Sequence, residues 1–155
     1  MIEIGHFIGG KRVAGKSGRS QDIMQPMDGS VRGKVALASK DELRAAVENA
    51  KAAQPAWAAT NPQRRVRVLM KFLELVQNEY DELAEMLARE HGKTIADARG
   101  DIQRGLEVVE VSIGAPHMMK GEFTDGAGPG IDVYSMRQPL GVVAGITPFN
   151  FPAMI

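Results

Sequence analysis

QPLGVVAGITPFNFP, residues 138–152, is the stretch from which we predict the fold of this chain. Residues 140–146 have no polar side chain and are too few for a free-standing helix, so they favour a strand buried on both faces of a parallel sheet. Ligands of such sheets bind beyond the carboxyl ends of the strands. We therefore expect an α/β protein with a candidate site at residues 147–150.

Asn150 lies between two prolines at the end of this predicted strand. Pro148 and Pro152 each fix their own φ, so the side-chain amide of Asn150 is expected to be held in one orientation. A fixed amide donor can stabilise an oxyanion. Alternatively, Asn150 only satisfies backbone groups in a proline-rich turn, as asparagines in turns often do. The spacing leaves both interpretations open.

Short strands are predicted on both sides of a helical region. Residues 7–13 are typical of a hairpin around Gly9-Gly10, and residues 31–37 of a further strand. Residues 121–130 hold four glycines and a proline, which favours a loop. Residues 131–137 alternate in polarity and predict a strand with one face covered.

Helices are predicted between residues 39 and 114. Ser39 and Glu42 form a capping box, in which each side chain accepts from the backbone of the other residue. Gly92 is a natural helix stop. The helices are expected to begin after Ser39, after Asn61, at Tyr80 and after Thr94.

Gly100, Gly105 and Gly114 interrupt the last of these helices. A glycine costs a helix interior roughly 1 kcal/mol against alanine, so these residues suggest the close approach of another backbone or a ligand path. Arg104 lies one helical turn from Asp101. From spacing alone, a surface ion pair between the two is the simpler interpretation of Arg104.

Composition excludes several classes of function. The 155 residues include 19 basic and 19 acidic side chains, a balance that argues against a dominant attraction to nucleic acid or an anionic membrane. No apolar run reaches the ~18 residues of a membrane span, and no leader peptide is recognised, so we expect a soluble, cytoplasmic protein. The sequence has no cysteine, and its three histidines are too far apart to predict a metal site.

The final ten residues carry a family resemblance. ITPFNFPAMI, residues 146–155, resembles the Pro-Trp-Asn-Phe-Pro signature of the aldehyde dehydrogenase superfamily, with Phe149 in place of the usual tryptophan. It is most similar to the CoA-acylating methylmalonate-semialdehyde dehydrogenase branch. Residues 90–94, 100–105 and 114–117 agree with this branch, and the resemblance covers essentially the whole chain.

The resemblance implies that this sequence is the N-terminal part of a longer enzyme. Residues 1–155 would belong to an incomplete NAD-binding domain, and residues 140–146 would be the first strand of its doubly wound sheet. Residues 122–138 would contribute to an oligomerisation arm of a homo-oligomer. The catalytic domain and its cysteine nucleophile would lie outside this sequence, so the 155-residue piece alone should be inactive.

The resemblance also implies a reaction: a semialdehyde, NAD and coenzyme A give acyl-CoA and NADH. Asn150 matches the residue that holds the oxyanion, and Arg104 is similar in position to an arginine that holds the substrate's carboxylate. The residues implied to contact NAD are Ile146, Thr147, Pro148 and Phe149.

Two other functions fit the sequence. One is a non-acylating NAD(P)-dependent aldehyde dehydrogenase, which hydrolyses its thioester instead of passing the acyl group to CoA. The other is a helical binding or scaffold module, which would suit the balanced charge and the missing nucleophile. A module of that kind should fold cooperatively on its own.

Overall fold

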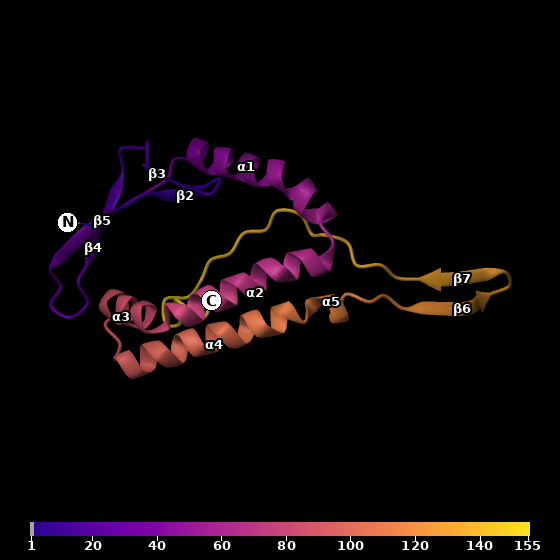
Figure 1. Ribbon diagram of the computed structural model, residues 1–155. Helices are drawn as coiled ribbons and strands as arrows, with labels where there is room; N and C mark the ends of the chain where they lie inside the picture. The colour runs from indigo at the N-terminus through magenta and orange to yellow at the C-terminus, as the bar shows by residue number, and fades with distance from the viewer. Residues whose placement is uncertain (1) are drawn as a thin grey trace.

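The computed structural model describes residues 2–155 as a mixed α/β chain, the class predicted from the sequence (Figure 1). Its N-terminal region contains β1 (Ile2–Ile4), β2 (His6–Ile8), β3 (Lys11–Val13), β4 (Ser20–Met24) and β5 (Val31–Ala36). β5 is the central strand of a sheet, parallel to β1 and antiparallel to β4. β2 and β3 form the predicted hairpin around Gly9-Gly10, whose φ angles of +60° and +75° suit glycine.

Four of the five helices described among residues 2–155 begin where the sequence predicts, and the short fifth is not predicted. They are α1 (Lys40–Ala59), α2 (Pro62–Asn78), α3 (Tyr80–His91), α4 (Ile95–Ile113) and the short α5 (Ala115–Met118). Both capping-box bonds are formed: Ser39 Oγ accepts from Glu42 N at 3.2 Å, and Glu42 Oε2 accepts from Ser39 N at 2.8 Å. Asn61 and Thr94 cap α2 and α4 through their side-chain oxygens. Gly92 ends α3 in the left-handed conformation, with φ +84°.

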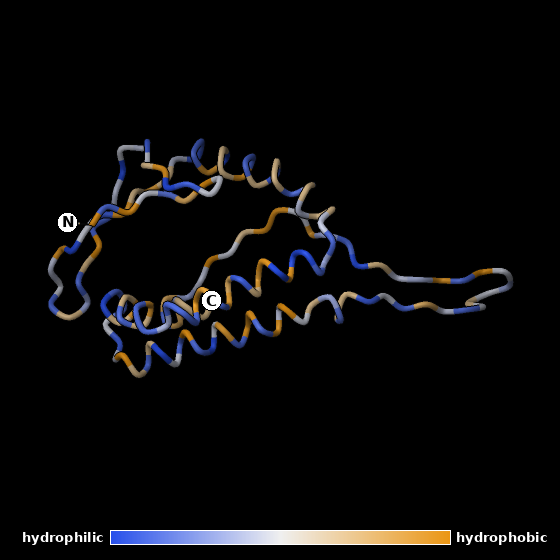
Figure 2. The backbone as a smooth tube through the Cα atoms, viewed as in Figure 1, coloured by the Kyte–Doolittle hydropathy of each residue, from blue (hydrophilic) through white to orange (hydrophobic). Residues whose placement is uncertain are grey.

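A small hydrophobic core lies between α3 and α4. Its buried members are Ala84, Leu87, Ala98, Ile102 and Leu106. The three members on α4 are spaced by four residues, so they form one stripe along that helix. Leu73 and Val76 on α2 pack against this core. Figure 2 shows the corresponding alternation of hydrophobic and hydrophilic residues along α2 and α4.

A second hairpin projects away from the helices (Figure 1). It consists of β6 (Phe123–Gly128) and β7 (Ile131–Tyr134), paired antiparallel. The predicted loop at residues 121–130 is therefore wrong for most of its length. Gly130, at φ +71°, turns the chain so that β7 pairs with β6, and this pairing outweighs the weak strand propensity of the glycines. Every residue of β7 is exposed, so the covered face predicted for this strand is also wrong.

The predicted strand at residues 140–146 is not formed. These residues follow an irregular path with no strand paired to them among residues 2–155, and they are exposed along their whole length. Leu140 is 93% exposed and Ile146 fully so. A strand needs neighbours for its backbone N–H and C=O groups, and the described residues provide none at this position. Figure 1 shows the segment returning from the hairpin towards α3 and the start of α4.

Two kinds of feature are absent from residues 2–155. No helix in this range is long and apolar enough to cross a membrane. The same residues contain no cluster of three or more histidine, cysteine, aspartate or glutamate side chains that could hold a metal ion.

Candidate functional site

The predicted site residues from Ile146 to Asn150 lie together on an exposed segment at the C-terminal end of the structure. Phe149 is 85% exposed. The side-chain amide of Asn150 makes no hydrogen bond to other described residues, and it is therefore not used to satisfy the local turn. These five residues present one amide, one hydroxyl and two large apolar side chains to the outside.

Asp101, on α4, holds the residues that follow Asn150. Its Oδ1 accepts a hydrogen bond from the backbone N–H of Met154 at 2.8 Å. Asp101 is 1% exposed. A buried carboxylate requires hydrogen-bond partners, since water cannot solvate it. The backbone N–H of Met154 meets part of this requirement and ties the C-terminal segment to the helix.

Lys93 meets the rest of the requirement. It directly precedes the N-cap of α4, and its Nζ lies 3.1 Å from Asp97 Oδ2 and 3.3 Å from Asp101 Oδ2. The same Nζ donates to the backbone carbonyl of Asn150 at 3.4 Å and lies 5.2 Å from the centre of the Phe151 ring. Lys93 therefore bridges the start of α4 and the turn that contains Asn150.

Asp97 and Asp101 hold Lys93 in its charged form. Desolvation lowers the pKa of Lys93, because its side chain is only 7% exposed. The hydrogen bonds that Lys93 donates to Asp97 and Asp101 and the charges of both carboxylates outweigh that effect, and the pKa of Lys93 is raised above its ordinary value of 10.5. Lys93 is therefore a permanent ammonium at neutral pH.

Two adjacent rows of side chains along α4 allow the helix to contact both the core and the C-terminal segment. Ala98, Ile102 and Leu106 face the core, while Asp97, Asp101 and Gly105 lie one position earlier, at the same spacing of four. A Cβ on Gly105 would lie 3.3 Å from Met154 Cα. The close backbone approach predicted for Gly105 is therefore confirmed.

The other glycines of this helix have different surroundings. A Cβ on Gly100 would meet no atom within 4 Å, so the close approach suggested there is wrong. Gly114 is the C-cap of α4, where the helix ends.

Arg104 is exposed and makes no ion pair or hydrogen bond to the other described residues. The ion pair with Asp101 that its spacing suggests is not formed, because Lys93 and Met154 occupy the two oxygens of that carboxylate. Arg104 directly precedes Gly105, whose backbone lies against Ala153 and Met154. Its guanidinium is thus available to an anionic ligand on the same part of α4.

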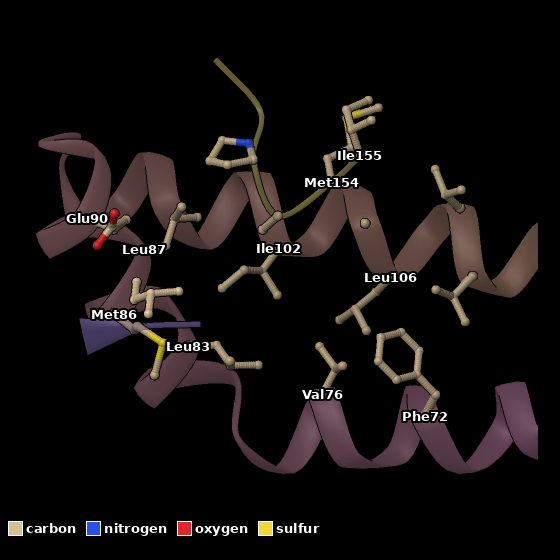
Figure 3. A pocket seen from close by; sticks show the side chains of 16 residues that line it. Phe72, Val76, Leu83, Met86, Leu87, Glu90, Ile102, Leu106, Met154 and Ile155 are labelled. Carbon is tan, nitrogen blue, oxygen red and sulfur yellow. The ribbon is translucent and has the colours of Figure 1, made fainter. Parts of the chain in front are cut away.

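An apolar groove of about 750 Å³ lies beside this attachment point (Figure 3). Side chains of α2, α3 and α4 line it, including Phe72, Leu83 and Ile102, and Met154 and Ile155 form one edge. Glu90 is the only charged residue in its wall. The groove has no polar groups arranged to orient a small ligand, so it is an apolar packing surface.

Lys93 and Asp101 are the site residues that the sequence analysis does not identify. A local signal exists, since Lys93 is followed by acidic residues at four and eight positions, and both lie on the same side of α4. No local signal connects either residue to Asn150 or Met154. Those contacts span 57 and 53 positions of the sequence.

Known proteins resemble this chain along nearly its whole length. The sequence model of the aldehyde dehydrogenase family matches residues 13–155. A malonate-semialdehyde dehydrogenase of Pseudomonas aeruginosa is 46% identical over 150 residues, which are 97% of this chain and 30% of that protein. The acylating, mitochondrial methylmalonate-semialdehyde/malonate-semialdehyde dehydrogenase of Homo sapiens is 46% identical over 96% of this chain and 28% of its own length. This chain thus spans less than a third of either relative.

Solved structures agree with these sequence relatives. A protein of Sinorhizobium meliloti 1021, assigned as a methylmalonate-semialdehyde dehydrogenase and solved with NAD, superimposes with a TM-score of 0.95 at 69% identity. The match covers 99% of this chain and 31% of that one. The methylmalonate-semialdehyde dehydrogenase of Oceanimonas doudoroffii gives a TM-score of 0.94 at 45% identity, with the same coverage of both chains.

Proposed function

This chain belongs to the aldehyde dehydrogenase family of oxidoreductases, and we propose that it forms the N-terminal part of an NAD-dependent, CoA-acylating methylmalonate-semialdehyde dehydrogenase. The observation that supports the proposal best is the match to such enzymes over 96 to 99% of this chain at 45 to 69% identity. The whole protein would oxidise a semialdehyde with NAD and pass the acyl group to coenzyme A. The cysteine nucleophile is proposed to lie outside residues 1–155.

Asn150 is proposed as the oxyanion donor. Attack of a thiolate on an aldehyde places negative charge on the former carbonyl oxygen, and an amide N–H fixed in position stabilises that charge without reorganising. Three features of this structure fit that role. The side-chain amide is exposed and unpaired among the described residues, the backbone carbonyl is held by Lys93, and prolines stand at positions 148 and 152.

Ile146, Thr147, Pro148 and Phe149 are proposed to contact NAD. They lie consecutively before Asn150, and all are exposed. A hydroxyl beside two exposed apolar side chains can hydrogen-bond a ribose or amide and pack against a planar ring. NAD, when bound, supplies the acceptor for the hydride that leaves the substrate carbon. The residues of this chain would then orient the cofactor next to the oxyanion donor.

Arg104 is proposed to bind the carboxylate of the semialdehyde. A guanidinium offers paired donors in a planar fork that matches a carboxylate, and its charge does not depend on pH. Arg104 fits this role because none of its donors is used by another described residue.

The remaining parts of the proposal concern the whole protein. Residues 122–138, which contain the projecting hairpin, are assigned to an oligomerisation arm, because exposed strand edges and apolar side chains are suited to pairing with another copy. The rest of residues 1–155 is assigned to the NAD-binding domain. We also assign the protein to the cytoplasm.

The test is the burst of NADH formation in the whole protein that contains this sequence, mixed with methylmalonate semialdehyde and NAD. Asn150→Ala should slow the burst by about 10² to 10³-fold, because one oxyanion donor is lost. Asn78→Ala, which removes an exposed amide at the end of α2, is the matched control and should leave the burst unchanged. An unaltered burst in Asn150→Ala would refute the oxyanion role of this residue.

Product analysis tests the acylating step separately. With coenzyme A present, the proposed enzyme should release an acyl-CoA. Release of the free acid at the same rate with or without coenzyme A would instead identify a non-acylating aldehyde dehydrogenase.

A further inference from the structure

The turn that carries Asn150 is held at two points, by Lys93 just before α4 and by Asp101 on α4. Lys93 donates to the carbonyl of Asn150 itself, and Asp101 accepts from the N–H of Met154, four residues later. Lys93 and Asp101 are also bound to each other at 3.3 Å. One buried ion pair therefore makes both of these polar contacts with the turn.

A buried Lys–Asp ion pair costs more free energy than is needed merely to attach this turn to the helix. Removing a lysine and an aspartate from water is costly, and apolar residues of similar volume would join a helix to a segment at lower cost. Charged groups differ from apolar ones in being directional, since each hydrogen bond restricts the position of the atom that it reaches. Here the two restricted atoms are the backbone oxygen of Asn150 and the backbone nitrogen of Met154.

The contact with Phe151 adds a third restriction. The ammonium of Lys93 lies 5.2 Å from the centre of that ring, within the range of a cation–π interaction. The residue that follows Asn150 is thus held by the same nitrogen as Asn150. Rotation of the turn about the chain direction would break both contacts at once.

We propose that Lys93 and Asp101 are positioning residues that set the direction of the Asn150 amide in the oxyanion site. This inference rests on the proposed function, because it gives the two residues a role only through Asn150. Neither side chain touches the reacting atoms. Lys93 fixes the backbone of Asn150 directly, and Asp101 keeps Lys93 in place while fixing Met154 at the end of the turn.

A double-mutant cycle on the NADH burst of the whole protein tests the proposal. Displacement of a catalytic group by about 1 Å can cost about 10²-fold in rate, so Lys93→Met should slow the burst about 10- to 100-fold. In the Asn150→Ala background the same substitution should change the burst less than about two-fold, because the group that Lys93 positions is already absent. A purely structural role would produce the same loss in both backgrounds.

Hydrogen exchange supplies a readout that does not depend on activity. Lys93→Met should speed amide exchange in peptides covering residues 150–154, where the Met154 N–H is bonded to Asp101. Arg99→Met is the matched control. Arg99 is a cation of α4 that pairs with Asp81 at 2.9 Å and has no contact with this turn, so its removal should leave those peptides unchanged.

Milder substitutions keep the test decisive if Lys93→Met does not fold. Asp101→Asn retains an oxygen that can accept from Met154 but loses one of the two carboxylate charges that hold Lys93, the other being that of Asp97, and it should give a smaller loss with the same coupling to Asn150. Lys93→Arg keeps the cation and should recover part of the burst.

Three results would overturn the inference. Equal losses in the two backgrounds would make Lys93 structural, and a normal burst in Lys93→Met would remove any role in positioning. A normal burst in Asn150→Ala alone would contradict the proposed function first, and this inference with it. The single Asn150 variant therefore shows which of the two ideas has failed.

Discussion

Gly105→Ala is the substitution whose effect depends most directly on the backbone contact between α4 and the C-terminal segment. The new Cβ would lie 3.3 Å from Met154 Cα and 3.5 Å from the Ala153 carbonyl oxygen. Two carbon atoms prefer a separation of about 3.5 to 4.0 Å, so Met154 must move by roughly 0.2 to 0.7 Å. Its N–H cannot follow that movement without lengthening the 2.8 Å bond to Asp101.

Two opposing terms set the stability of this variant. Alanine in a helix interior is favoured over glycine by about 1 kcal/mol. Overpacking against a fixed neighbour costs about 1 to 3 kcal/mol. Gly100→Ala in the same helix receives the first term alone, because a Cβ there meets no atom within 4 Å. Gly105→Ala should therefore be about 1 to 3 kcal/mol less stable than Gly100→Ala.

The effect on rate follows from the displacement. If a shift of 1 Å costs about 10²-fold, a shift of about 0.2 to 0.7 Å costs about 2- to 25-fold in kcat, while Gly100→Ala should retain the wild-type value. Thermal unfolding midpoints and steady-state kcat of the whole protein provide the two measurements. If Gly105→Ala gains as much stability as Gly100→Ala and turns over normally, then the close contact does not constrain the site.

Arg104→Leu should lower kcat/KM for a carboxylated semialdehyde far more than for propanal, because only the former has a carboxylate for the guanidinium to bind; equal losses on both substrates would make Arg104 structural. The hydrogen bond from the backbone N–H of Ser39 lowers the pKa of Glu42 below its ordinary value of 4.5. The stability that this carboxylate contributes is therefore fully present above pH 4.5 and is lost as the pH falls through the lowered pKa. Glu42→Gln should accordingly reduce the difference between thermal midpoints at pH 6 and at about pH 3, and an unchanged difference would contradict this. Gly92→Ala should destabilise the protein by about 1 to 2 kcal/mol or more in denaturant unfolding, because φ is +84° and the new Cβ would lie 3.0 Å from Pro26 Cβ; a neutral result would show that the α3 terminus relaxes freely.

Helix starts could be predicted from the sequence because their determinants are local. Ser39 and Glu42 satisfy each other's backbone groups within one turn, and Asn61 and Thr94 act on the residues two and three positions ahead. The Gly92 terminus likewise depends on the conformation of one residue. Such signals do not depend on how the rest of the chain folds.

Strands were harder to predict because a strand is completed by a partner. The apolar run at residues 140–146 is suited to burial in a sheet, yet no strand among residues 2–155 lies beside it. The glycines of residues 123–128 suggested a loop, but antiparallel pairing with β7 makes them a strand. In both segments the amino-acid composition only shows whether a strand is compatible with the sequence, and pairing with a neighbouring strand decides whether one forms.

In the candidate site, too, features set by local sequence could be predicted and features set by long-range contacts could not. Asn150 and the four residues before it could be identified from the family signature, and the structure brings them together because they are consecutive. Lys93 and Asp101 could not be identified, because their contacts with the turn depend on how the chain returns to α4. Their contacts with the turn are seen only in the three-dimensional structure.

The bond between Asp101 and Met154 also closes a loop of 53 residues that contains the projecting hairpin. The entropy lost on closing a flexible loop grows only with the logarithm of its length, so doubling such a loop would cost only about 0.6 kcal/mol. Both ends of this loop are fixed on one rigid helix. The hairpin can therefore lengthen, shorten or bend while the distance between α4 and the Asn150 turn stays constant.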